Sequence, residues 1–171
     1  MSINGSEQLT RADIQRIEAE IEHRKMVVRP AALKALKEAR ALGDLSENFE
    51  YHVAKRDNNM NNSRIRYLEK LLRFATVVEE EEDDTKVGMN NTVVVYFEED
   101  DEEETYRIVT SIRSDSRKGL ISNESPLGKA LIGHQVGDRV EVEIEGGASY
   151  FVVIRSLEKT GEADTDRIHS Y

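Results

Sequence analysis

Two long periodic runs of helix-favouring residues, separated by a short turn that contains Gly43, constrain this chain more than any other feature of its sequence. The first run starts at Thr10 and carries apolar residues at helical spacing, namely Ile14, Ile17, Ile21, Val28, Ala32, Leu36 and Ala39. The second extends from about Glu47 to Val77, and its apolar face comprises Phe49, Val53, Met60, Leu68, Leu72 and Ala75. Gly43, which lies between the runs, is a typical helix stop.

Two helices of about 30 residues, each roughly 45 Å long, can be joined by so short a turn only if they lie antiparallel and side by side. The apolar stripe is too thin for a thick bundle, and Arg56, Asn61 and Asn62 thin it further. Pro30 lacks the N–H of a helical hydrogen bond, so it should kink or restart the first helix. We therefore predict an isolated antiparallel coiled-coil hairpin over residues 1–78, with its tip near 43–48.

The second half of the chain has a different pattern, typical of strands. Residues 92–97, 105–110, 139–144 and 150–154 are rich in β-branched and aromatic residues, and Gly146-Gly147 favours a tight turn between the last two segments. Ser125 followed by Pro126 predicts the start of a short helix. We predict a small antiparallel sheet with one short helix over 91–158, and hence a two-domain α+β chain. An acidic linker over 79–90 precedes this domain, and a disordered tail over 159–171 follows it.

Charge is distributed unequally between the two halves. Residues 1–77 carry 14 Lys and Arg against 11 Asp and Glu, whereas residues 78–171 carry 10 against 23. Many of these acids form two runs, Glu79–Asp84 and Glu98–Glu104, which we interpret as solvated loops, the second at a hairpin tip. Such a surface should repel DNA, so we expect no stand-alone, sequence-specific DNA binding.

Composition excludes several classes of site. The chain has no cysteine, which rules out disulfides, thiolate nucleophiles and zinc–cysteine sites and fits a reducing cytoplasm. It contains no apolar run near the length of a membrane span and no leader pattern at its start. We expect a cytoplasmic protein that does not bind membranes.

The turn between the helical runs carries acids at Asp44, Glu47 and Glu50. The spacing Asp44-x-x-Glu47 alone favours a capping box, in which both side chains bond to backbone amides at a helix start. The alternative is that the hairpin exists to present these carboxylates. Glu50, one turn further on, is typical of a solvated helical residue.

Both halves resemble one family, the bacterial Gre factors, which are the transcript cleavage factors of RNA polymerase. In the first half the motif Gly43-Asp44-Leu45-Ser46-Glu47-Asn48, followed by Tyr51-His52, carries the resemblance. In the second half, Thr105–Val109, Ser125–Gly133 and Val136-Gly137-Asp138 carry it independently. The similarity covers roughly residues 9–157, and its details are closer to GreA than to GreB. Phe49 departs from the family, which usually has alanine there.

This resemblance implies a transcription elongation factor. The coiled-coil hairpin would enter the secondary channel of RNA polymerase, and an FKBP-like C-terminal domain would dock at the channel rim. The factor would stimulate the polymerase's own cleavage of backtracked nascent RNA and rescue arrested complexes, so it would not itself be an enzyme. Asp44 and Glu47 would help to hold a second magnesium ion and the attacking water in the polymerase.

Magnesium takes oxygen ligands and keeps several waters, and two exposed carboxylates are too few to hold it. We therefore expect no metal site in the free protein and no cofactor beyond the Mg²⁺ shared with the polymerase. Basic residues on the second helix could neutralise phosphates of the RNA 3′ end, or they could simply form a solvated face. The candidates for contact with RNA or polymerase are Tyr51, Lys55, Arg56, Arg66, Lys70 and Arg73. Tyr51 could instead pack against the first helix.

Three other functions are compatible with parts of the sequence. An inhibitory Gre paralogue would occupy the same channel without promoting cleavage, but the presence of both Asp44 and Glu47 argues against it. A peptidyl-prolyl isomerase would share the implied C-terminal fold, yet residues 105–157 offer only the aromatics Tyr106, Tyr150 and Phe151 for a substrate pocket. A bare coiled-coil scaffold would leave the turn motif and the second domain unexplained.

Overall fold

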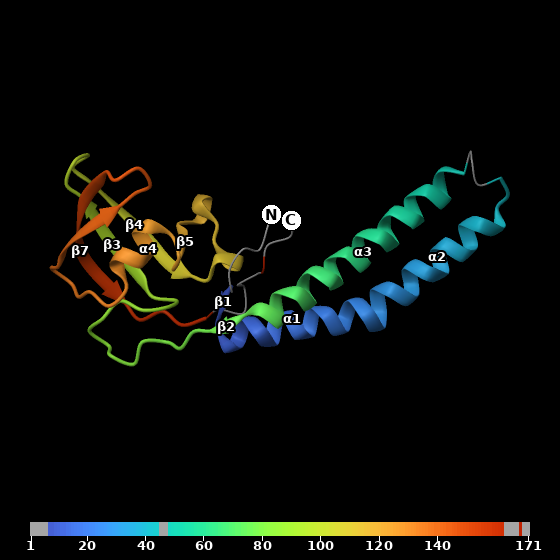
Figure 1. Cartoon of the computed structure of the whole chain (residues 1–171), viewed down its shortest axis with the longest axis horizontal. Helices are drawn as coiled ribbons and strands as arrows, with labels where there is room; N and C mark the ends of the chain where they lie inside the picture. The colour runs from blue at the N-terminus through green and yellow to red at the C-terminus, as the bar shows by residue number, and fades with distance from the viewer. Residues whose placement is uncertain (1–6, 45–47, 163–167, 169–171) are drawn as a thin grey trace. The chain divides into compact units, whose positions relative to one another are not determined.

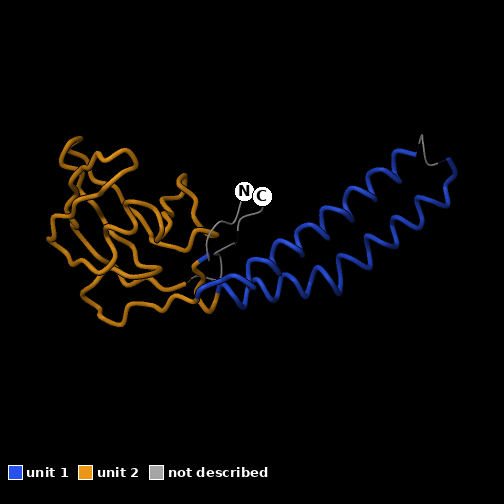
Figure 2. The backbone as a smooth tube through the Cα atoms, in the orientation of Figure 1, with its two compact units in different colours: residues 1–7, 13–76 blue, residues 8–12, 77–171 orange. Residues whose placement is uncertain are grey.

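The computed structural model of the chain describes residues 7–44, 48–162 and 168. Its internal contacts divide the chain into two compact units, one of residues 1–7 and 13–76 and the other of residues 8–12 and 77–171 (Figure 2). The predicted α+β fold class is confirmed, with a helical hairpin in the first unit and a sheet with a short helix in the second.

The hairpin has one interrupted arm and one continuous arm (Figure 1). The interrupted arm consists of α1 (Arg11–His23), a π-helical turn (Arg24–Val28) and α2 (Arg29–Ala41), and the continuous arm is α3 (Phe49–Phe74). The second helix was expected to reach Val77 but ends at Phe74. Thr76–Val77 instead form the short strand β2, which pairs with β1 (Gln8–Leu9) through bonds such as Val78 N–H to the Leu9 carbonyl, at 2.9 Å.

The interruption of the first arm lies where Pro30 predicted a restart. Pro30 stands in the first turn of α2, where a missing N–H is tolerated. Directly before it, the Arg29 N–H bonds to the Arg24 carbonyl five residues back, which is the π-helical pattern. One wide turn therefore connects two α-helical segments.

The buried stripe of α3 differs in phase from the predicted one. Ile65, Leu68 and Leu71 are buried, but Met60 is 63% exposed and Phe49 is 78% exposed, so the prediction that these two lie on the inner face is wrong. The stripe passes through Asn61 instead, which is 4% exposed. Asn61 is accommodated because its amide accepts a bond from Arg24 Nη1 (3.2 Å) and donates one to the Arg24 carbonyl (3.3 Å) at the π-helical turn.

The second unit contains a five-stranded sheet in the order β5-β4-β3-β7-β6. The strands are β3 (Thr92–Phe97), β4 (Glu102–Val109), β5 (Leu120–Ser122), β6 (Arg139–Glu143) and β7 (Ser149–Glu158). All neighbouring pairs are antiparallel except β4 and β5, which are parallel, so the sheet is mixed. The four predicted strands are present, and β5 is an additional edge strand.

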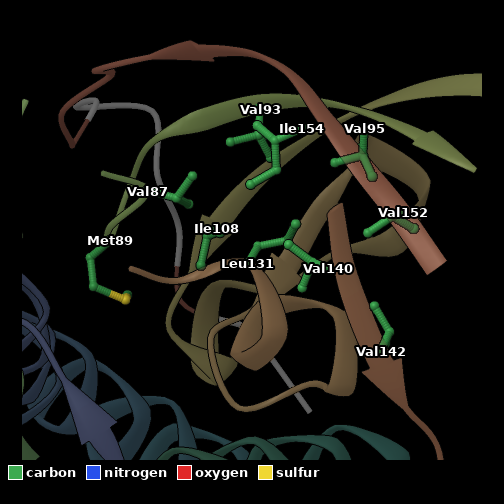
Figure 3. Packing of buried hydrophobic residues seen from close by; sticks show 10 residues of the cluster. All are labelled: Val87, Met89, Val93, Val95, Ile108, Leu131, Val140, Val142, Val152 and Ile154. Carbon is green, nitrogen blue, oxygen red and sulfur yellow. The ribbon is translucent and has the colours of Figure 1, made fainter. Parts of the chain in front are cut away.

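The core of this unit lies between the sheet and α4 (Pro126–Leu131). Figure 3 shows its members, Val87, Met89, Val93, Val95, Ile108, Leu131, Val140, Val142, Val152 and Ile154. The helix begins as predicted, because the Ser125 hydroxyl accepts the Gly128 N–H at 3.1 Å. A Cβ at Gly128 would meet the Ser122 carbonyl oxygen at 2.1 Å, so only glycine permits this close approach.

Two segments predicted to be loose are hydrogen-bonded. Glu102–Glu104 of the second acidic run belong to β4 rather than to a turn, since they pair with β3. After β7, Lys159 Nζ donates to the Lys86 carbonyl (2.6 Å) and Thr160 Oγ1 to the Asn90 carbonyl (2.5 Å). The predicted disorder therefore does not apply to 159–162, where polar side chains replace strand pairing.

Candidate functional site

The turn of the hairpin is closed by one side chain, that of Asn48. Its Oδ1 accepts the Tyr51 N–H at 3.0 Å, which makes Asn48 the N-cap of α3. Its Nδ2 donates to the Ala39 carbonyl in the last turn of α2, at 2.6 Å. The same carbonyl accepts the Leu42 N–H, and the chain then leaves the helix at Gly43 with φ +123°. Asn48 thus satisfies one backbone group at each of the two helix ends.

Asp44 is the described member of the predicted acidic pair, and it is exposed. Glu47 lies outside the described residues, together with residues 45 and 46. The alternative interpretation gave the acids a capping role, but the N-cap of α3 is Asn48, four residues after Asp44. The N-cap of α3 is therefore not Asp44, and the Asp44 side chain is exposed to solvent at the turn.

The Tyr51 ring lies near one cation from each arm of the hairpin. The Arg40 guanidinium carbon is 5.7 Å from the centre of the Tyr51 ring, and Lys55 Nζ is 6.0 Å from it. Cations at such distances are attracted to the ring face. The turn thus places an aromatic ring and two positive charges one to two helical turns from the cap. Sequence reasoning missed Arg40, which lies three residues before the Gly43-Asp44 motif.

The remaining basic candidates do not form one patch with Tyr51. Arg56 is exposed, and its Nε lies 3.6 Å from Oδ1 of Asp57, the next residue, in an ion pair. Arg66, Lys70 and Arg73 are exposed on α3, but the nearest begins 15 residues after Tyr51, which corresponds to about 22 Å of helix. The structure therefore separates the candidates into a group at the tip and a group near the other end of α3.

A shallow apolar groove lies beside the turn. It has a volume of about 490 Å³, and its walls include Ala35, Ala39, Leu42, Phe49 and Val53. Carboxylates of Glu38, Glu50 and Asp57 line it as well. Phe49, the departure from the family pattern, is exposed here and does not pack the end of the hairpin.

An ion network crosses the middle of the hairpin. Arg64, which is 8% exposed, donates from Nε and Nη2 to the two Glu20 oxygens at 2.9 and 3.2 Å, and Arg24 Nε donates to Glu20 at 2.7 Å. Burial acts to raise the pKa of the Glu20 carboxyl, but the hydrogen bonds from Arg64 and Arg24 outweigh it, so this pKa lies below its ordinary value. The network joins the arms at the level of the π-helical turn.

The aromatic residues of the second unit pack on one another. The Phe97 ring is stacked on Tyr150 at 6.0 Å and lies edge-on to Tyr106 at 6.3 Å, and all three contact the core. Burial, followed by a hydrogen bond to Glu104, raises the pKa of Tyr106. Phe151, by contrast, contacts Arg139, whose guanidinium lies 3.6 Å from the ring centre. The three aromatics named for an isomerase pocket are therefore not gathered at one place.

Arginines form ion pairs with acids in and beside the acidic turn of the sheet. Arg139 donates from Nε and Nη2 to the two oxygens of Glu98, at 2.7 and 2.8 Å, and Arg155 lies 3.4 Å from Glu103. Within the described residues, no cluster of three or more His, Asp or Glu is arranged to hold a metal ion. None of the described helices is long and apolar enough to cross a membrane.

Comparison with known proteins finds similarity in both halves of the chain. Residues 7–77 match the family model "Transcription elongation factor, N-terminal", and residues 81–159 match "Transcription elongation factor, GreA/GreB, C-term". The chain is 43% identical over 139 residues to transcription elongation factor GreA of Methylobacterium nodulans, covering 81% of this chain and 88% of that protein. It is 42% identical over 153 residues to GreA of Streptococcus thermophilus, covering 89% and 95%.

The chain is also similar, at lower identity, to solved structures. The GreA factor homolog 1 (Gfh1) protein of Thermus thermophilus is 24% identical, with coverage of 90% of this chain and 99% of that one and a TM-score of 0.42. The factor GreA/GreB from Nitrosomonas europaea is also 24% identical, with 90% and 98% coverage and a TM-score of 0.38.

Proposed function

Because this chain belongs to the GreA/GreB family of transcription elongation factors, we propose that it acts on RNA polymerase as a transcript cleavage factor. The hairpin would enter the polymerase secondary channel, and the second unit would dock at its rim. The factor would stimulate the polymerase's intrinsic cleavage of backtracked RNA in the cytoplasm, as an accessory factor and not as an enzyme of its own. The observation that carries the proposal is the exposed Asp44 at a turn whose N-cap is provided by another residue.

The chemistry explains why a carboxylate is needed at this position. In-line hydrolysis of a phosphodiester uses one metal ion to activate water and another to stabilise the leaving oxygen. Magnesium binds oxygen ligands and retains water, so a weakly held second ion gains from an added carboxylate. Asp44 and Glu47 would supply these oxygens to an ion held mainly by the polymerase, and would orient the attacking water.

The group at the tip would act on the RNA. Arg40 and Lys55 place positive charge around Tyr51, close to the turn that carries Asp44. Cations near the extruded 3′ end would neutralise phosphates without reading sequence, and the tyrosine ring could stack on a base. Arg66, Lys70 and Arg73, further along α3, would instead contact the channel wall or more distal RNA.

The test is RNA cleavage in a stalled, backtracked polymerase complex. Wild type is expected to release short 3′ fragments, and Asp44→Asn/Glu47→Gln to bind the polymerase but lose about 100-fold in rate, the order expected for removing preorganised electrostatic groups. Glu50→Gln is the matched control, since Glu50 is an exposed acid on the first turn of α3, and it should retain the wild-type rate. If wild type slows elongation without releasing fragments, the protein is a channel-blocking paralogue and the proposal fails.

A further inference from the structure

Asn48 uses both ends of its amide to connect the two arms of the hairpin. The Oδ1 atom accepts from the first turn of α3, and the Nδ2 atom donates to the Ala39 carbonyl of α2. The orientation of the amide is fixed by its partners, because a backbone N–H can only donate and a carbonyl can only accept. One planar group therefore sets the separation of the two helix ends.

No other small capping residue can make both bonds. Serine, threonine and aspartate accept a hydrogen bond at an N-cap as asparagine does. Aspartate, however, has no donor for the Ala39 carbonyl, and a serine hydroxyl is too short to reach both partners. The cap alone therefore does not explain an amide here, whereas the second bond does.

Packing contributes little at this end of the hairpin. Ala39 is the buried residue of α2. Leu42 and Phe49, which flank the turn, are 69% and 78% exposed. A Cβ built on Gly43 would meet no atom within 4 Å, so no neighbouring group packs against the turn at this residue. The directional bonds of Asn48 thus join the two arms at the tip, beside the contact between Arg40 and the Tyr51 ring.

We propose that Asn48 is a positioning residue for transcript cleavage. By fixing the distance between Ala39 and the start of α3, it restrains the described ends of the turn, and Asp44 belongs to one of them. This inference rests on the proposed function of Asp44. Loss of the Nδ2 bond would leave α3 capped and folded but would let the Asp44 carboxylate move relative to the reacting phosphate.

Two variants of the full-length protein separate the two bonds. Asn48→Ser keeps an acceptor for the Tyr51 N–H, but its hydroxyl is too short to reach the Ala39 carbonyl as well, whereas Asn48→Ala loses both bonds. For Asn48→Ser we expect unchanged helical circular dichroism and polymerase affinity, and a cleavage rate lower by between about 10- and 100-fold at saturating factor. The Mg²⁺ concentration for half-maximal cleavage should rise, a shift that a change of stability alone would not cause. Asn59→Ser, at an exposed asparagine of the same helix, is the matched control.

A distance measurement tests whether Asn48 connects the two arms, independently of cleavage. The chain has no cysteine, so two introduced cysteines can be spin-labelled uniquely. Labels at Lys37 and His52, both exposed, should give a broader distance distribution in Asn48→Ser than in wild type. Labels at Glu22 and Ser63, near the ion network, should not change.

The outcomes distinguish this inference from the proposed function. If wild type cleaves and Asn48→Ser matches it in rate, Mg²⁺ dependence and label distances, Asn48 is only a cap and the inference is wrong. If wild type releases no fragments, the proposed function fails and the cleavage role of Asn48 fails with it. The label distances would then still report whether the amide holds the two arms together.

Discussion

The two ends of the hairpin are held by different forces. Toward its base, Ile17, Ile65 and Leu68 are buried to 2% exposure or less, and burial of such side chains contributes about 1.5 to 3 kcal/mol each. At the tip Leu42 and Phe49 are exposed, and one asparagine bonds to both arms. Burial is non-directional and supplies stability, whereas hydrogen bonds are directional and specify geometry with little buried area. The tip, which we propose takes part in RNA cleavage, is therefore the end of the hairpin where directional hydrogen bonds join the arms.

The ion network lies between these extremes. Arg64 is buried and its charge is matched by Glu20, so the pair combines burial with direction. Removal of one partner from such a pair leaves a buried charge without compensation, which costs more than the intact pair contributes. The comparison of base and tip therefore predicts a gradient of mutational effects along the hairpin.

The largest effect is expected at the base. Leu68→Ala should lower the free energy of unfolding by about 2 to 5 kcal/mol, because it removes a buried side chain and leaves a cavity. Urea unfolding of the full chain, followed by helical circular dichroism, measures this. Leu33→Ala is the control, since Leu33 is a half-exposed leucine on α2, and it should change stability by less than about 0.5 kcal/mol. Equal effects of the two substitutions would contradict a packed base.

An intermediate, pH-dependent effect is expected in the middle. Glu20→Gln should cost about 1 to 3 kcal/mol at neutral pH, because it weakens charged hydrogen bonds to Arg64 and Arg24. The folded-state pKa of Glu20 is lowered, so its contribution is fully present above the unfolded-state value of about 4.3 and is lost as the pH falls through the folded value. Unfolding measured between neutral and acidic pH should show wild type and variant converging in acid. A constant difference across that range would disprove the assignment.

The smallest effect is expected at the tip. Phe49→Ala should change the free energy of unfolding by less than about 0.5 kcal/mol, because the ring is largely exposed. The same urea experiment measures it, beside Leu68→Ala as the positive reference. A loss above about 1 kcal/mol would show that the ring packs at the tip, and the contrast between the two ends of the hairpin would then be wrong.

Sequence periodicity predicted much of this fold because the elements are long and regular. The two arms, the restart at Pro30, four strands and the cap at Ser125 all follow from local rules. Local rules did not predict which face of α3 is buried. Asn61 lies on that face because its amide bonds to a carbonyl at the π-helical turn. That turn is a property of backbone geometry that no residue pattern indicates.

The candidate site was predictable in its residue types but not in its connections. Asp44 and Glu47 were identified through the resemblance, while Asn48 stood in the same motif without an assigned role. Asparagine is a frequent N-cap, so one of its two bonds could have been expected. The bond to Ala39 joins residues on different helices and depends on the length and path of the turn. The cation contacts of Tyr51 with Arg40 are tertiary in the same way.

The anchored segment after β7 has a consequence for the order of folding. Thr10 donates to Glu162, a partner 152 positions away in the chain, whereas Lys25 and Glu69 of the hairpin are 44 positions apart. Chains emerge from the ribosome N-terminus first, and contacts between distant positions form late. The hairpin can therefore assemble while synthesis continues, but the second unit is complete only when almost the whole chain has been released. During translation, the sheet would be the last part to become resistant to proteases.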